Sequence, residues 1–182
     1  MSSAAKPFQI LNEIARDSVK FAAGLPQQGE AVELWNGIGF VISGTHYVAE
    51  MGTVSEILHL PKYTAVPGVQ SWMRGIANVR GRLLPVMDLG RFFDLPSSTT
   101  KSRERRVLVV EHGDALSGVI VDGVLGMQYF SADSFESEGL EGLPEKISPF
   151  VKGSFVKSDT RWNVFSTSEL TSDEQFLDVA LR

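Results

Sequence analysis

The side chains that could do chemistry in this 182-residue chain are few and scattered. There is no cysteine, and the three histidines, His46, His59 and His112, do not stand beside other potential metal ligands at site spacing. Asp88 and Asp94 could form a carboxylate pair, yet in a strand-to-loop stretch they need not face each other, so a cap or a solvated charge is the simpler interpretation. No phosphate-binding glycine loop, nucleophile elbow or dinucleotide fingerprint is present. The sequence therefore predicts a protein that is not an enzyme and that uses no metal and no cofactor.

Charge is distributed unevenly along the chain. The formal net charge is −5, from 17 basic and 22 acidic side chains. Residues 74–106 sum to +5, and the remainder therefore sums to −10. A basic stretch within an acidic chain favours an acidic partner. Arginine suits a carboxylate-rich protein, because its planar guanidinium can bond a carboxylate through two parallel hydrogen bonds.

Nucleic acid is the alternative partner for this basic stretch, because small β-barrels can bind it. Such barrels interleave aromatic side chains with basic strands for base stacking, whereas only Trp72, Phe92 and Phe93 lie near these arginines. The negative net charge also disfavours nucleic acid. A protein partner is the better interpretation, and a small β-barrel nucleic-acid-binding protein is the alternative.

The elements that would carry these side chains are mostly short strands. From Gly37 onward, apolar runs separated by glycine predict about nine or ten strands arranged in hairpins. The expected strands are 39–42, 47–51, 75–80, 83–87, 106–111, 116–122, 124–130, 150–157 and 161–165. This is more than one small barrel holds, which favours two barrels with a shared core. The clearest loop, 96–102, could separate the two halves.

Helical patterns are confined to the two ends of the chain. Apolar residues recur at helical spacing over 8–24, and Gly24 and Pro26 would end that helix. A closing helical stretch is expected over 168–181, with buried positions at Leu170, Phe176, Leu177, Ala180 and Leu181. Residues 1–30 are thus expected to form a helical extension, and residues 31–182 the main domain.

Nothing in the sequence predicts a membrane protein. The longest apolar runs, such as 107–110 and 118–121, are far shorter than the ~20 residues of a membrane span. The first seven residues have no charged start followed by an apolar stretch, so no signal peptide is expected. A cytoplasmic protein is the expected class.

The segment from Val69 to Leu95 is the most distinctive part of the chain. It predicts a short helical lead-in, a strand, a tight turn over 80–82, a second strand broken by Pro85 and a capped turn at Asp88. The turn would present Arg80 and Arg82 at the tip of the strand pair, where a partner could reach them. A hairpin with solvated arginines is the simpler alternative.

This segment resembles the signature of the CheW-like family of chemotaxis coupling proteins. Gly75 to Gly81 matches the strand pattern Gly-(apolar)-x-Asn-(apolar)-Arg-Gly. Arg82 to Leu89 matches the pattern that follows it, x-(apolar)-(apolar)-Pro-(apolar)-(apolar)-Asp-Leu. Three further stretches agree in order and spacing: an opening hairpin at 39–50, a Val-x-Glu-Ile segment at 54–58 and a late hairpin at 106–124. The resemblance covers about residues 37–170.

The resemblance implies a mainly β, CheW-like fold of two small SH3-like five-stranded β-barrels sharing a hydrophobic core, with helices at both ends and no catalytic activity. It implies an adaptor, recruited to membrane receptor arrays, between a chemoreceptor cytoplasmic tip and the regulatory domain of a CheA-type histidine kinase. Carried over by position, the partner-binding residues are Val54, Glu56, Ile57, Arg74, Gly75, Asn78, Arg80, Gly81, Gly118, Asp122 and Val124. Arg80 is expected to matter most, whereas Gly118, Asp122 and Val124 could be structural instead.

Some features resemble one branch of this family. They are the N-terminal helix with its Ala22-Ala23-Gly24-Leu25-Pro26 ending, the polar strand at 161–165, and the segments 59–64 and 77–85. They are similar to the branch that serves type IV pilus (twitching motility) signalling rather than flagellar chemotaxis. The resemblance therefore implies an output on type IV pili.

Overall fold

The computed structural model describes residues 7–21, 33–96, 101–113, 115–137 and 142–181. The chain divides into two compact units, Met1–Val32 and Glu33–Arg182. In the first unit, α1 (Pro7–Phe21) confirms the predicted amphipathic helix, with Ile10, Leu11 and Ile14 on its apolar side. The predicted helix end at Gly24 and Pro26 lies outside the described residues.

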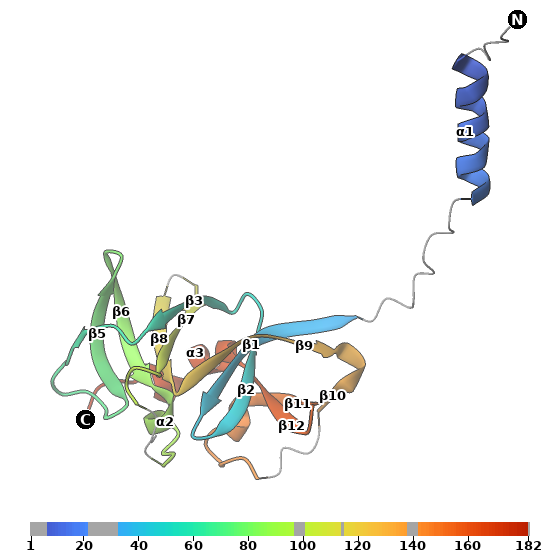
Figure 1. Cartoon of the computed structure of the whole chain (residues 1–182). Coiled ribbons are helices and arrows are strands. Elements are labelled where there is room, and N and C mark those ends of the chain that lie inside the picture. Colours follow the sequence, from blue (N-terminus) through green and yellow to red (C-terminus); the bar gives the residue numbers. More distant parts are fainter. Residues whose placement is uncertain (1–6, 22–32, 97–100, 114, 138–141, 182) are drawn as a thin grey trace, which may run out of the picture. The chain divides into compact units, whose positions relative to one another are not determined.

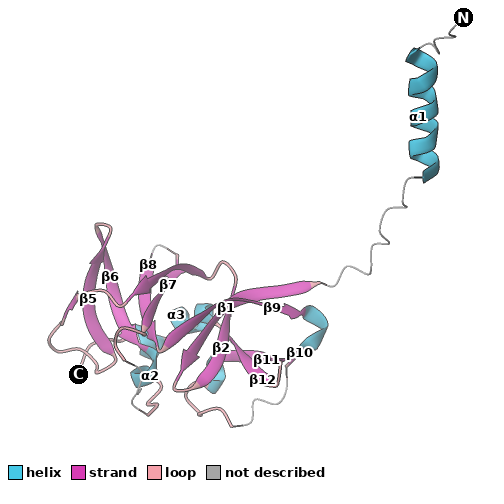
Figure 2. Ribbon diagram, in the orientation of Figure 1, coloured by secondary structure: helices cyan, strands magenta, loops and turns pink. Residues whose placement is uncertain are grey.

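The second unit is built from two sheets (Figure 1 and Figure 2). Sheet A contains β1 (Leu34–Ile42), β2 (Thr45–Glu50), β9 (Gly123–Ser131), β10 (Phe135–Glu136), β11 (Val151–Lys157) and β12 (Thr160–Phe165), in the order β10-β11-β12-β2-β1-β9. Sheet B contains β3 (Val54–His59), β4 (Tyr63–Thr64), β5 (Met73–Val79), β6 (Arg82–Asp88), β7 (Arg106–His112) and β8 (Ala115–Val121), in the order β3-β7-β8-β6-β5-β4. Each sheet thus has five longer strands and one strand of two residues. The predicted mainly β fold is confirmed.

The chain enters sheet A, crosses to sheet B and then returns. Strands β1 and β2 precede the whole of sheet B, and β9 to β12 follow it. The return takes place at Asp122, between β8 and β9. The loop over 96–102 does not separate the halves as expected, because the strands on either side of it, β6 and β7, both belong to sheet B.

The hydrophobic core has one shared part and two local parts. In the shared part, Phe40 and Tyr47 of sheet A pack with Leu108 and Val119 of sheet B. Burial of the Tyr47 side chain raises the pKa of its hydroxyl to about 12. The local part in sheet B is formed by Ala77, Leu84, Val86, Val107, Val109 and Ile120, and the local part in sheet A by Val48, Phe130, Phe155, Trp162 and Val164. The apolar side chains shared by both sheets hold them together as one domain.

The C-terminal segment differs from its expected single helix. It forms α3 (Thr167–Ser172) and α4 (Glu174–Leu177), and Asp173 between them begins α4, since its Oδ1 accepts a hydrogen bond from the Phe176 N–H at 2.8 Å. Leu170 and Phe176 are buried as predicted. Leu177, Ala180 and Leu181 are exposed, so their predicted burial is wrong.

Ala180 and Leu181 are exposed because the chain leaves the helical path after α4, whereas Leu177 is the last residue of α4 and lies on its exposed side. Ala180 forms an isolated bridge with Val69, and the Gln70 N–H donates to the Val179 carbonyl at 2.9 Å. The helical lead-in that the sequence predicts before Gly75 is not formed, and residues 71 and 72, which follow this pairing, form a turn.

Candidate functional site

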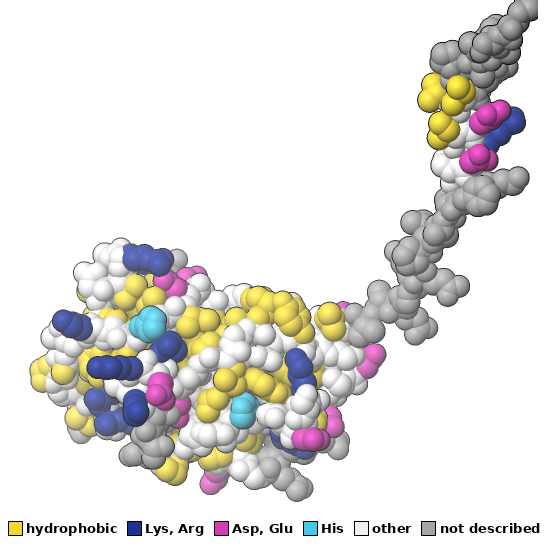
Figure 3. All heavy atoms as spheres, viewed as in Figure 1, with side chains coloured by type: hydrophobic (Ala, Val, Ile, Leu, Met, Phe, Trp, Pro, Cys, Tyr) yellow, Lys and Arg dark blue, Asp and Glu magenta, His cyan; other side chains and the backbone are white. Residues whose placement is uncertain are grey.

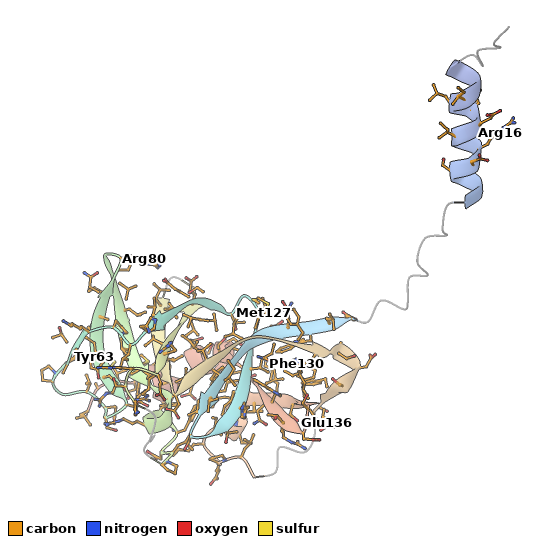
Figure 4. All side chains as sticks on the ribbon, viewed as in Figure 1. Arg16, Tyr63, Arg80, Met127, Phe130 and Glu136 are labelled. Carbon is orange, nitrogen blue, oxygen red and sulfur yellow. The ribbon has the colours of Figure 1, made fainter. Side chains whose placement is uncertain are left out.

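The tip of the β5–β6 hairpin presents Arg80 to solvent (Figure 4). Arg80 and Gly81 form a two-residue turn, with φ of +51° and +82° respectively. Positive φ at both central residues is the geometry of a type I′ turn, which matches the twist of a hairpin. The Asn78 Oδ1 accepts a hydrogen bond from the Gly81 N–H at 2.9 Å and fastens the turn. Asn78 and Gly81 therefore shape the turn on which Arg80 is carried.

Arg80 meets an acidic side chain from a distant strand of the same sheet. Its NH2 atom lies 2.7 Å from Oε1 of Glu56 on β3. Three strands stand between β3 and β5 in the order of sheet B, so this ion pair spans the open side of a curled sheet. The Arg80 side chain is 78% exposed and that of Glu56 is 29% exposed. The pair is therefore accessible to a partner, and two sequence-predicted residues are brought together.

A cavity of about 210 Å³ adjoins this ion pair. Its floor includes the buried side chains of Leu84 and Val109. Its remaining lining is Ser55, Glu56, Val79, Arg80, Arg82, Glu111 and Leu116. An apolar floor with charged groups around it suits an aliphatic side chain from a protein partner, because interfaces combine a desolvated centre with a polar rim.

The other predicted residues of β3 do not share one surface with Glu56. Exposure alternates along the strand, so Ile57 is 40% exposed, whereas its neighbour Glu56 is half-buried. Val54 packs against the shared core. The structure therefore divides Val54, Glu56 and Ile57 between the interior and the surface.

The backbone of Gly75 lies very close to the backbone of Thr64 on β4. Its φ is +145°, and a Cβ built on it would lie 2.2 Å from the carbonyl oxygen of Thr64 on β4. The strand register shifts between Met73 and Gly75, which leaves Arg74 in a β-bulge. Gly75 is thus required for the path of β5, and Arg74, half-buried in the bulge, lies beside it.

Gly118 and Val124 also have packing positions. A Cβ at Gly118 would lie 2.9 Å from side-chain atoms of both Leu84 and Val107. Val124, on β9, packs against the shared core. These contacts favour the structural alternative for both residues.

Asp122 belongs to a buried charged network that the sequence did not predict. Arg105 donates two hydrogen bonds to Asp88, from NH1 at 3.0 Å and NH2 at 3.2 Å, and its Nε lies 3.5 Å from Asp122 Oδ1. Asp122 Oδ2 accepts a hydrogen bond from the Ser43 N–H at 2.7 Å. Asp88 is also the N-cap of α2 (Leu89–Phe92), since its Oδ1 accepts a hydrogen bond from the Arg91 N–H. This confirms the predicted capped turn.

Because of this network, less of the positive charge of residues 74–106 is exposed than the sequence suggests. The Arg105 side chain is only 19% exposed, so this cation lies in the interior and not on a basic surface. Arg106 donates to the carbonyl groups of residues 103, 104 and 105. Asp88 and Asp94 do not form a pair, because Asp94 contacts Lys146 instead. Arg74, Arg105 and Arg106 are thus half-buried, whereas Arg80, Arg82, Arg91, Lys101 and Arg103 are exposed. Figure 3 shows Lys and Arg side chains on this part of the surface.

The side chains that would support nucleic-acid binding are not available at the surface. Trp72 is 8% exposed and Phe93 is 2% exposed, and Phe92 is half-buried among other aromatic rings. Base stacking needs an accessible ring face. The arrangement therefore favours a protein partner.

A second accessible surface, which was not predicted from the sequence, lies on sheet A. Alternate residues of β9 are exposed apolar side chains, Leu125 at 43%, Met127 at 46% and Tyr129 at 49%, and Leu34 of the paired strand β1 is 59% exposed. Figure 3 shows apolar side chains over this strand pair, and Figure 4 labels Met127 on it. We call Leu34, Leu125, Met127 and Tyr129 the β1–β9 face. Its signal in the sequence was a strand with apolar neighbours at Val124 and Leu125 and again at Tyr129 and Phe130, which place apolar side chains on both faces.

Within the placed parts of the chain, no three or more His, Asp or Glu side chains gather as a potential metal site. None of the described helices is both long enough and apolar enough to cross a membrane.

Known proteins resemble this chain over most or all of its length. The CheW-like domain family matches residues 36–175. Protein PilI of Pseudomonas aeruginosa is 50% identical over 181 residues, which cover 100% of both chains. Chemotaxis protein CheW of Helicobacter pylori is 27% identical over 129 residues, 71% of this chain and 74% of that protein.

A solved structure has the same fold. The scaffolding protein TtCheW of Thermoanaerobacter tengcongensis superposes with a TM-score of 0.68 at 22% identity, over 79% of this chain and 96% of that one. The chain therefore belongs to the CheW-like family, whose members are coupling and scaffolding proteins of chemosensory signalling and are generally not enzymes.

Proposed function

We propose that this protein is a non-enzymatic adaptor that couples a methyl-accepting chemoreceptor to a CheA-type histidine kinase in a pathway controlling type IV pili. The observation that carries the proposal is the 50% identity to Protein PilI over the full length of both chains, the N-terminal helix included. The identity to Chemotaxis protein CheW of Helicobacter pylori extends over only 71% of the chain.

The two accessible surfaces support a bridging role, because they lie on different sheets. The Arg80–Glu56 pair with its cavity belongs to sheet B and offers charge beside an apolar floor. We assign it to the kinase regulatory domain. The β1–β9 face belongs to sheet A and suits the apolar side of a helix, which is the expected form of a receptor tip. We assign it to the receptor.

Arg80→Ala is expected to weaken binding of the kinase regulatory domain about tenfold or more, since an interfacial arginine often carries a large share of binding energy. Folding should be little affected, because an exposed ion pair contributes only about 0–1 kcal/mol to stability. Isothermal titration calorimetry measures the affinity, and thermal unfolding measures the stability. Arg103→Ala, at an exposed arginine of the same basic stretch, is the matched control and should bind normally.

A charge swap separates direct contact from a purely internal role of the pair. The double variant Glu56→Arg with Arg80→Glu rebuilds the ion pair in reverse. If Arg80 contacts the kinase, the double variant binds no better than the single Arg80 variant. Full recovery of binding by the swap would mean that the pair only maintains the shape of sheet B.

Met127→Glu is expected to weaken receptor binding about tenfold while leaving kinase binding within about twofold, because a buried interfacial charge without a partner is costly. Co-sedimentation with receptor-containing membranes and titration with the kinase domain measure the two affinities. Val156→Glu is the matched control, since Val156 is 48% exposed and Met127 is 46% exposed, and both lie on sheet A strands. Equal loss of receptor binding in both variants would contradict a specific role for the β1–β9 face.

The output of the pathway is tested in the organism that carries the protein. Deletion of the gene should reduce twitching on a surface, and swimming in soft agar, where the organism swims, should be retained. Normal twitching after deletion would exclude the pilus output, and complementation with the Arg80→Ala variant should restore twitching poorly.

A further inference from the structure

The Asp88–Arg105–Asp122 network lies where the two sheets meet. Asp88 ends β6 of sheet B, and Asp122 lies at the point where the chain passes from β8 of sheet B to β9 of sheet A. Asp122 also holds the β1–β2 turn of sheet A, since its Oδ2 accepts from the Ser43 N–H at 2.7 Å and its own N–H donates to the Val41 carbonyl at 2.9 Å. One arginine thus joins sheet B to a turn of sheet A through two carboxylates.

The charges of this network are largely removed from solvent. The side chains of Asp88, Asp122 and Arg105 are 6%, 8% and 19% exposed, beside a cavity of about 140 Å³. Buried charges are tolerated only in a geometry that pairs them. The NH1 and NH2 groups of Arg105 both donate hydrogen bonds to Asp88. Its Nε lies within ion-pair distance of Asp122 but forms no hydrogen bond. A shift of one sheet against the other would therefore lengthen the distance between Arg105 Nε and Asp122 Oδ1 before it broke the hydrogen bonds to Asp88.

Two kinds of contact hold the sheets together, the shared apolar core and the charged network. Apolar burial is non-directional, whereas hydrogen bonds and ion pairs depend on the placement of particular atoms. Bidentate hydrogen bonds from a guanidinium are directional and add geometric specificity. The two bonds to Asp88 lie within sheet B and orient the guanidinium of Arg105, so that its Nε stands 3.5 Å from Asp122 Oδ1. Asp122 in turn accepts a hydrogen bond from the β1–β2 turn of sheet A, so the network links positions in both sheets.

We propose that Arg105 is a positioning residue that fixes the orientation of sheet B relative to sheet A, and with it the spacing between the two partner surfaces. Its effect on signalling rests on the proposed adaptor function, whereas its effect on the sheets does not. An adaptor can transmit a change from receptor to kinase only if its two surfaces keep a defined geometry.

Conservative variants test this role because they keep a polar side chain of similar size at each position. Arg105→Lys keeps the positive charge but cannot make the fork to Asp88 and reach Asp122 at once. Asp122→Asn keeps an oxygen acceptor for the Ser43 N–H and removes the charge that faces Arg105. Arg103→Lys, at an exposed arginine two positions away, is the matched control.

The absence of native cysteine makes a direct distance measurement possible. Spin labels at Val156→Cys on β11 of sheet A and Glu111→Cys on β7 of sheet B report the separation of the sheets, and both positions are exposed. We expect one narrow distance distribution in the parent and in Arg103→Lys, and a broadened or shifted one in Arg105→Lys and Asp122→Asn. An unchanged distribution in both network variants would overturn the proposal.

Amide exchange and signalling complete the test. In Arg105→Lys, Asp122 loses the guanidinium that holds it in place, so its hydrogen bond from the Ser43 N–H should weaken. Exchange of the Ser43 amide should then accelerate about tenfold, the factor expected for weakening one charge-assisted hydrogen bond. In a reconstituted mixture, binding of the kinase domain alone should stay within about twofold of the parent, whereas receptor control of kinase activity should fall about tenfold. Broadened distances with unchanged receptor control would overturn the positioning role. Failure of the parent protein to bind either partner would instead overturn the adaptor function, and the label distances would still decide what Arg105 does to the sheets.

Discussion

Gly75→Ala is expected to lower the free energy of unfolding by about 3 kcal/mol or more, because two penalties act at one position. The backbone φ of +145° is one that residues with a side chain rarely adopt, and the new Cβ would lie 2.2 Å from the Thr64 carbonyl oxygen. The obstructing atom belongs to the backbone, so it cannot move aside as a flexible side chain would. Urea-induced unfolding followed by tryptophan fluorescence measures the change.

Gly123→Ala is the matched control for that substitution. No atom lies within 4 Å of the place where its Cβ would stand, and its φ is not in the positive range. Its free energy of unfolding should change by less than about 0.5 kcal/mol, as is usual for surface substitutions. A loss at Gly75 no larger than at Gly123 would contradict the close approach of β4 and β5.

Arg105→Ala is expected to cost about 3–5 kcal/mol of stability, since removing one partner of a buried ion pair leaves an uncompensated buried charge. Here two carboxylates remain, with side chains that are 6% and 8% exposed. Adding Asp122→Asn to Arg105→Ala should recover part of the loss, because it removes one of those charges. Arg103→Ala should be nearly neutral, and equal stability of the Arg103 and Arg105 variants would contradict the burial of the network.

The signature hairpin was predictable because its determinants are local. Asn78, Arg80 and Gly81 lie within four residues, and the turn they form depends on positive φ and one short hydrogen bond. The Arg80–Glu56 contact follows from the curl of a whole sheet, which residue spacing alone does not provide. The resemblance named both residues as partner-binding positions but gave no reason for them to meet.

The interior position of Arg105 could not be read from composition. Its two partners, Asp88 and Asp122, lie in different hairpins, so their proximity depends on the tertiary fold. A count of charges does not distinguish a buried arginine from an exposed one. The break at Asp173 did carry a signal, since aspartate is a favoured helix N-cap. It was missed because Leu170 and Phe176 lie on either side of it and fit one continuous apolar pattern.

The structure also divides the family signature by role. Gly75, Asn78 and Gly81 have positions that shape the backbone of the β5–β6 hairpin, through positive φ, a close approach and one hydrogen bond. Arg80 is an exposed signature side chain that forms an ion pair with an accessible acidic neighbour, Glu56. Substitutions in the first group should therefore change stability, whereas Arg80 should change binding.

The bridging role itself is tested most directly by analytical ultracentrifugation of the full chain with a soluble receptor-tip fragment and the kinase regulatory domain. If the two partner surfaces lie on separate sheets, all three proteins sediment as one ternary complex, and saturating amounts of either partner leave binding of the other intact. Displacement of one partner by the other, or binding of neither, would contradict the adaptor function.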